Sequence, residues 1–215
     1  MVDKLKSSKE NINNKQEIIT LITFIFIGLI MGVVAKWCDT FAQWGNWLST
    51  LLVHIGFLGS GFGIWIFLGA YISVKSKTPL WACIKVPLFF LSMLLSYYLY
   101  SIIIVDYFSK KIIYGWCFFS LLTTIFAYCY WYAKGDKLIN NIICAIPIGM
   151  IIAHTIPTYR GYSATYILEI IFAIILLFIV KKDKSNRIKA LGLSLVFAIL
   201  FSIIPIYELI FGYLL

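Results

Sequence analysis

Residues 163–189 read SATYILEIIFAIILLFIVKKDKSNRIK, an apolar run followed at once by a cluster of basic residues. A helix needs about 20 apolar residues to cross a hydrocarbon core about 30 Å thick. Only one ionisable acid, Glu169, interrupts the run. Lys and Arg accumulate in cytoplasmic loops. The stretch therefore predicts a transmembrane helix whose last residues lie at the cytoplasmic surface.

The whole chain has the composition of a membrane protein. Its 215 residues are 62% hydrophobic and 13% charged, with a mean hydropathy of +0.94. Soluble proteins are about 45–50% apolar and about 25% charged. The predicted fold class is an all-α, polytopic membrane helix bundle. We expect a polar cytoplasmic tail over residues 1–16 and a single transmembrane domain over residues 17–215.

Apolar runs broken by short polar segments predict about seven transmembrane helices. The second run is too long for one simple helix, because residues 46–57 precede a glycine cluster that extends to Gly63. Residues 46–57 either begin the span or lie in the membrane interface. The predicted spans are 17–36, 46–74, 80–105, 113–133, 138–156, 163–180 and 188–213.

Basic residues predict the orientation of these spans. With the N-terminus in the cytoplasm, thirteen Lys and Arg residues fall in cytoplasmic segments and four fall in outer segments. This asymmetry predicts a cytoplasmic N-terminus and an external C-terminus. Lys85 falls within the third span near its cytoplasmic end, where a lysine side chain can extend to the surface.

Ionisable groups within the spans supply the candidate site. Each costs about 2.5–3.5 kcal/mol at a helix centre on the insertion scale, so such groups usually face the bundle interior. In the predicted topology these groups share the outer half of the membrane. We expect Glu169 to face the interior beside a polar partner, with His154, His54, Tyr166 or Arg160 as the partner. The candidate ligand-binding residues are Glu169, His154, His54, Glu208, Asp39, Tyr166 and Arg160.

The same sequence features can also be explained without a ligand-binding site. His54, His154 and Glu208 lie near helix ends, where a polar side chain costs little. The small residues of the first and last spans, such as Gly28, Gly32 and Ser194, are typical of helix packing. Pro87 and Pro147 indicate irregular helices, which occur in transporters and in ordinary membrane bundles alike.

Several function classes find no support in the sequence. The net charge of +9 is dispersed over loops, so no nucleic-acid partner is predicted. HExxH, GxSxG and GxxxxGK[ST] motifs are absent, and no catalytic residue is assigned. The two His residues and five Cys residues lack zinc-site spacing, so neither a metal nor a cofactor is predicted. A Cys38–Cys117 disulfide would require a Cα separation that sequence cannot supply.

The segments GLIMGVVAKWCDT (28–40) and GFGIWIFLGAYISVKSKTPLWACIKVPLFFLSMLLSYYLYS (61–101) carry a resemblance. This half of the chain resembles an uncharacterised family of small bacterial polytopic membrane proteins. The resemblance implies a bacterial cytoplasmic membrane and adds no catalytic residue. In size and helix number the chain is also similar to substrate-binding subunits of vitamin transporters, without a shared motif.

Two functional hypotheses follow. The first is a small-solute transporter or membrane-embedded binding subunit, with an outward-facing polar pocket formed by spans 2, 5, 6 and 7. The alternative is a non-catalytic accessory protein that docks a membrane protein partner. Lipid is a partner in either case, and a membrane hydrolase is a third, more distant hypothesis.

Overall fold

The computed structural model describes residues 14–41, 62–106, 110–156 and 165–203, and every regular element within them is helical. This confirms the all-α prediction for the described part of the chain. The elements are α2 (Asn14–Phe41), α4 (Phe62–Lys75), α5 (Pro79–Tyr100) with a π-helical extension (Ser101–Val105), α6 (Lys110–Trp131) with a 3-10 turn (Tyr132–Lys134), α7 (Leu138–Thr155), α8 (Thr165–Val180) and α9 (Lys184–Ile203).

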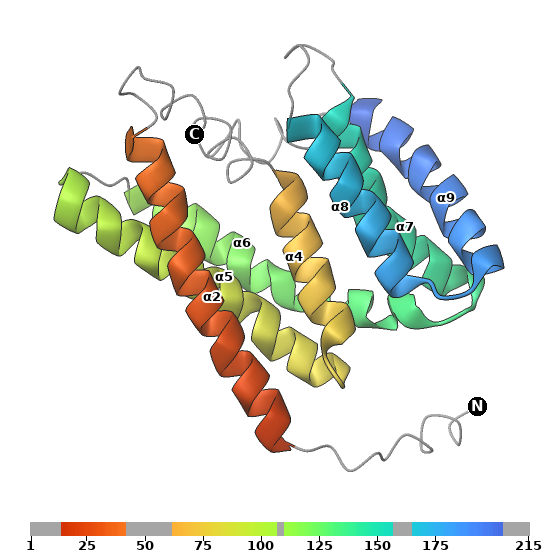
Figure 1. Ribbon diagram of the computed structural model, residues 1–215, viewed down its shortest axis with the longest axis horizontal. Coiled ribbons are helices and arrows are strands. Elements are labelled where there is room, and N and C mark those ends of the chain that lie inside the picture. The colour runs from red at the N-terminus through yellow and green to blue at the C-terminus, as the bar shows by residue number, and fades with distance from the viewer. Residues whose placement is uncertain (1–13, 42–61, 107–109, 157–164, 204–215) are drawn as a thin grey trace.

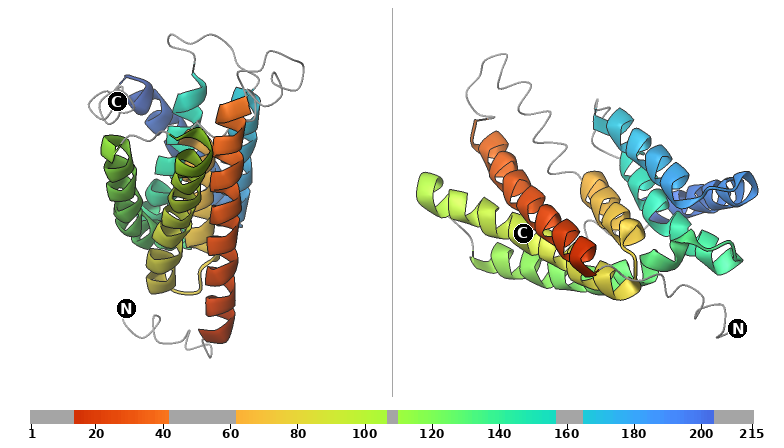
Figure 2. Two further views of the ribbon diagram at one scale, coloured as in Figure 1. Left: turned by 90° about the vertical axis from the view of Figure 1, so that its left-hand side faces the viewer. Right: turned by 60° about the horizontal axis from the view of Figure 1, so that its bottom comes forward.

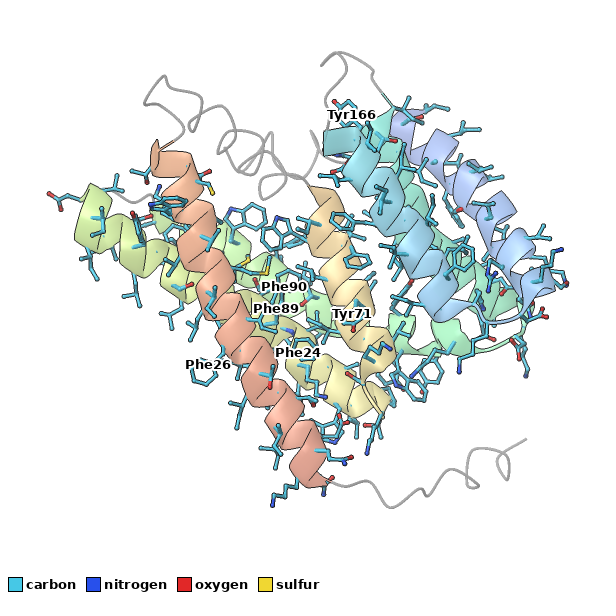
Figure 3. All side chains as sticks on the ribbon, viewed as in Figure 1. Phe24, Phe26, Tyr71, Phe89, Phe90 and Tyr166 are labelled. Atoms are coloured by element: carbon cyan, nitrogen blue, oxygen red, sulfur yellow. The ribbon has the colours of Figure 1, made fainter. Side chains whose placement is uncertain are left out.

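The helices suit a lipid environment in length and in surface. Within the described residues, α2, α5, α6, α7 and α9 are long and apolar enough to cross a membrane, and α4 and α8 are shorter apolar helices. Large apolar side chains cover the outside: Phe26 is 61% exposed and points away from the bundle in Figure 3. A soluble protein rarely presents so much apolar surface, whereas a lipid-facing surface requires it. The chain is a membrane protein.

Helix α4 joins two groups of helices. It contacts α5 and α6 on one side and α7 and α8 on the other. Helices α2, α5 and α6 form the first group, and α7, α8 and α9 form the second, as Figures 1 and 2 show. Successive helices run in opposite directions (Figure 1). We call the end where α2 and α7 finish and α4 and α8 begin the upper end, as drawn in Figure 1, and the opposite end the lower end.

Local sequence explains where the helices begin. Thr78 has an extended backbone, and its hydroxyl accepts a hydrogen bond from the backbone N–H of Trp81, as an N-cap does. Pro79 follows at the first helical position, where its missing N–H costs nothing. At the start of α9, Asp183 caps the helix by accepting a hydrogen bond from the backbone N–H of Asn186. Pro87 and Pro147 are buried inside α5 and α7, which continue through them.

Two apolar clusters fill the interior. The first lies where α4, α5 and α6 meet and includes Ile72, Phe89 and Phe90, with Phe24 and Tyr71 packed nearby, as Figure 3 shows. The second lies among α4, α7 and α8, with contributions from α6 and α9, and its buried members include Ile148 and Leu176. Because α4 supplies residues to both clusters, it couples the two helix groups.

Small residues let α2 approach α5 closely, and they let α7 approach α9 in the same way. Gly28 and Gly32 of α2 lie directly against Ser92 and Ser96 of α5, leaving no room for a Cβ. A Cβ at Gly149 of α7 would lie 2.6 Å from the Cβ of Phe197 and 2.9 Å from the carbonyl oxygen of Ser194 on α9. Without a hydrophobic drive between helices in lipid, such close contacts favour association. Helix packing therefore accounts for these small residues.

The expectation for Lys85 was wrong. Its side chain does not reach the surface but is 2% exposed, and its Nζ lies 2.7 Å from Oε2 of Glu17 on α2. The ammonium also donates to the hydroxyl oxygen of Thr20 at 2.7 Å. The Glu17 carboxylate and the Thr20 hydroxyl bind the Lys85 ammonium in place of the water that it would meet at the surface. The buried Lys85–Glu17 pair joins α2 to α5 near the lower end.

The five cysteines are free, so Cys38 and Cys117 form no disulfide in this structure.

Close packing of α7 on α9 predicts different outcomes for two glycines. Gly149→Ala should lower the free energy of unfolding by about 1–3 kcal/mol, because the new methyl group overlaps α9. Gly192→Ala is the matched control: nothing lies within 4 Å of its Cβ position, and alanine favours helix by up to about 1 kcal/mol. Thermal unfolding of the purified variants in detergent measures both. Equal midpoints would contradict the packing described.

Candidate functional site

His154 and Glu169 face each other at the upper end of the bundle. His154 belongs to the last turn of α7, and Glu169 lies one turn after the start of α8. The Nδ1 atom of His154 lies 2.8 Å from Oε2 and 3.0 Å from Oε1 of Glu169. Glu169 is 3% exposed, whereas the His154 side chain is 28% exposed. The carboxylate is thus enclosed, and the imidazole lies between it and the surroundings of the bundle.

Gly63 shapes the space around the carboxylate. A Cβ at Gly63 would lie 2.7 Å from Oε1 and 2.9 Å from Cγ of Glu169, closer than real Cβ contacts allow. The first turn of α4 can therefore approach the carboxylate only because residue 63 has no side chain. The glycine cluster of the second predicted span thus serves, at this position, a close helix contact.

Tyr166 lies on the same face of α8, one turn before Glu169. Its ring stands edge-on to the His154 imidazole, with the centroids 6.5 Å apart and the planes at 90°. Figure 3 shows Tyr166 at the upper end of α8. Three of the seven candidate residues from sequence, His154, Tyr166 and Glu169, lie together in the structure.

The pair leaves one ring nitrogen open. When Glu169 is ionised, both of its oxygens are acceptors, so Nδ1 carries the hydrogen of this contact and donates it. The Nε2 atom has no hydrogen-bond partner among the described residues. It accepts a hydrogen bond when the imidazole is neutral and donates one when the imidazole is charged. A carboxylate that holds Nδ1 fixes the tautomer and orients the ring, so Nε2 is presented in a defined direction.

Apolar packing separates this pair from the lower end. Below Glu169 on α8 follow the buried Ala173 and Leu176, and below His154 on α7 follow the buried Ile151 and Ile148. All four belong to one apolar cluster. Within the described residues, the pair is therefore approached from the upper end alone.

Asp39 lies at the upper end but apart from the pair. It is exposed and accepts a hydrogen bond from the Tyr97 hydroxyl at 2.8 Å, while the Lys36 ammonium lies 5.1 Å from the centroid of the Tyr97 ring. Because α2 packs on α5, Asp39 is directed to a different helix group. Three candidates, His54, Arg160 and Glu208, lie outside the described residues, as do residues 46–57.

Sequence analysis missed a polar network at the lower end. Lys181 is 1% exposed and donates to the carbonyl oxygen of Gly135 at 2.6 Å. Burial lowers the pKa of Lys181. Asn141 donates to Asn186 Oδ1 at 3.1 Å, and Asn186 donates to Asp136 Oδ1 at 3.2 Å. Counting basic residues for topology treats every loop lysine alike, so no sequence signal distinguished this buried one.

No family model, curated protein or solved structure matches this chain. The resemblance of residues 28–40 and 61–101 to a family of small bacterial membrane proteins therefore stays a prediction. The described residues contain no group of three or more His, Cys, Asp and Glu side chains that could hold a metal ion.

The fit of Gly63 against Glu169 can be tested with a control on the same helix. Gly63→Ala should destabilise the protein by about 1–3 kcal/mol, because the methyl group displaces a carboxylate already bonded to His154. Gly69→Ala should have little effect, since its Cβ would meet Phe90 at 3.5 Å, an ordinary contact. Thermal unfolding measures both. In a Glu169→Ala background, which lacks the obstructing side chain, Gly63→Ala should no longer lower the free energy of unfolding. If Gly63→Ala still destabilised the protein there, its contact with Glu169 would not be the cause.

Proposed function

We propose that this chain crosses the membrane seven times, with its N-terminus in the cytoplasm, and binds a small solute from the outside at the His154–Glu169 pair. The antiparallel course of successive helices supports the topology (Figure 1). So does the distribution of basic residues over the described chain. Lys36 and Lys110 lie toward the upper end, whereas the lower end carries Lys15, Lys75, Lys77, Lys134, Lys137, Lys181, Lys182, Lys184, Arg187 and Lys189. The lower end is then cytoplasmic, and the pair is external.

One observation carries the binding function: the Glu169 carboxylate is enclosed, whereas the His154 side chain is partly exposed and its Nε2 atom has no partner among the described residues. The Glu17–Lys85 pair provides an internal comparison. There both side chains are sealed, at 4% and 2% exposure, and a threonine hydroxyl also bonds the ammonium. A purely structural ion pair at membrane depth requires that kind of enclosure. His154 departs from this enclosure, because its side chain is 28% exposed and no described residue bonds its Nε2 atom.

The arrangement suits a transporter or a binding subunit of one. Transporters place ligand sites where helix groups meet, with an apolar barrier toward the opposite side of the membrane. Here Glu169 contacts α4, the helix that joins the two groups, and the apolar cluster lies between the pair and the lower end.

The alternative, an accessory protein that docks a partner, predicts small-residue faces free for docking. Gly28, Gly32, Gly149 and Ser194 instead pack within the bundle. Their use inside the protein favours the solute-binding proposal.

Reporter fusions test the topology independently of ligand. A reporter after Leu215 should be external, and one inserted between Lys181 and Lys189 should be cytoplasmic, because the basic residues hold that loop inside. Accessibility of each reporter in whole cells is the measurement. A cytoplasmic C-terminus would indicate an even number of spans and would remove the argument that the pair faces outward.

Purified protein tests the binding function. Mass spectrometry of co-purified small molecules identifies a ligand, and added ligand should raise the thermal unfolding temperature of the wild-type protein. Glu169→Gln and His154→Gln should fold but lose this stabilisation, because each removes half of the pair.

Asp39→Asn is the matched control, since Asp39 is an acid at the same end bonded to Tyr97 instead. Stabilisation that survives both Glu169→Gln and His154→Gln would place the site elsewhere.

A further inference from the structure

We call the His154–Glu169 pair and its surroundings the upper site. The charges at this site limit the kind of ligand that the proposed function can involve. Glu169 supplies a buried negative charge. The elements packed against it bring few other titratable groups within the described residues: α7 contributes His154, α8 contributes Tyr166, and the upper halves of α4 and α9 contribute none. Neither a described Lys nor a described Arg faces the pair.

An ionised carboxylate enclosed in apolar surroundings requires one compensating positive charge. The structure offers one position for it, on the imidazole. A proton on the imidazole supplies the charge directly. A cation at Nε2 supplies it equally well, since the neutral imidazole then accepts a hydrogen bond through Nε2 while Nδ1 still donates to Glu169. The two positive charges exclude each other because they compete for the same ring nitrogen.

We propose that the upper site binds a small organic ammonium ion in exchange for a proton. The inference rests on the proposed solute-binding function and specifies its ligand. In the exchange, the imidazolium gives its Nε2 proton to water, and the ligand's N–H donates to the vacated Nε2 lone pair. One cation is bound and one proton is released: the Nε2–H bond breaks, and an O–H bond forms on the water molecule that takes the proton.

The surroundings favour an organic cation over other ligands. The Tyr166 ring lies beside the imidazole. Phe172 follows Glu169 by about one turn of α8 and stacks on Phe67 of α4, with the ring centroids 5.0 Å apart. Aromatic faces attract ammonium groups and pack against apolar carbon. An anion would have only the imidazolium to hold it, whose charge Glu169 already compensates, and neither a described Lys nor a described Arg faces the pair. The described residues also lack the three ligands that a metal ion would need.

Calorimetry with three probes of similar size tests the proposal on the full-length protein in detergent. Benzylamine is a cation across pH 6–8, benzyl alcohol is neutral, and benzoate is an anion. Benzylamine should bind at least tenfold more tightly than either. Titration in two buffers of different ionisation heat should show proton release that approaches one proton per benzylamine bound as the pH is lowered. Its apparent Kd should rise by up to about tenfold for each unit of falling pH, because protons compete with it.

Two variants separate the roles of the residues. His154→Gln should abolish proton release, because the ring that holds the proton is gone. Glu169→Gln should remove the preference for benzylamine over benzyl alcohol, because the fixed charge is gone. Asp39→Asn should match the wild-type protein in both measurements.

The outcomes distinguish this inference from the proposed function. Failure of wild-type protein to bind benzylamine, equal affinity for the three probes, or binding without proton release would overturn the exchange of cation for proton. If a neutral or anionic ligand bound in a manner dependent on Glu169, the solute-binding function would stand and the cation inference would fall. If no probe or co-purified ligand depended on either member of the pair, both would fall.

Discussion

A carboxylate at membrane depth must find its partner inside the protein, and this constraint organises both halves of the bundle. Lipid offers neither hydrogen bonds nor solvation, so each enclosed acid determines which helix lies beside it. Glu17 requires Lys85, which joins α2 to α5. Glu169 requires His154, which joins α7 to α8. The apolar clusters fill the space between these fixed contacts, and α4 contributes to both clusters.

The two helix groups also share a packing relation that the sequence does not display. In one, the glycines of α2 lie against the serines of α5; in the other, Gly149 of α7 lies against α9 at Ser194. No repeated motif connects the two halves of the chain, yet small residues bring helix pairs together in the same way. The groups differ at their ion pairs: one is sealed and the other leaves Nε2 of His154 open. That difference distinguishes a structural contact from a candidate site.

The sequence was sufficient for the all-α fold class, and it named His154 as one of four candidate partners of Glu169. Hydropathy reports the preference of a whole segment for lipid, so the apolar runs predicted helices close to those observed, although α2 begins at Asn14 instead of residue 17. Depth along each helix then placed an acid and an imidazole at one level. The partners of Lys85 and Asp39 were not predictable in this way, because they depend on which faces of α2 and α5 meet. Gly63 was recognised as part of a glycine cluster, but its contact with Glu169 depends on how α4 crosses α8.

The central claim is that His154 and Glu169 act as one unit, and a double-mutant cycle on stability tests it most directly. Unfolding free energies are measured for the wild-type protein, His154→Gln, Glu169→Gln and the double variant in one detergent. The account predicts that each single variant destabilises the protein and that the double variant costs less than their sum, with a coupling of about 0.5–3 kcal/mol. Additive effects would show that the two side chains do not interact and would contradict the account.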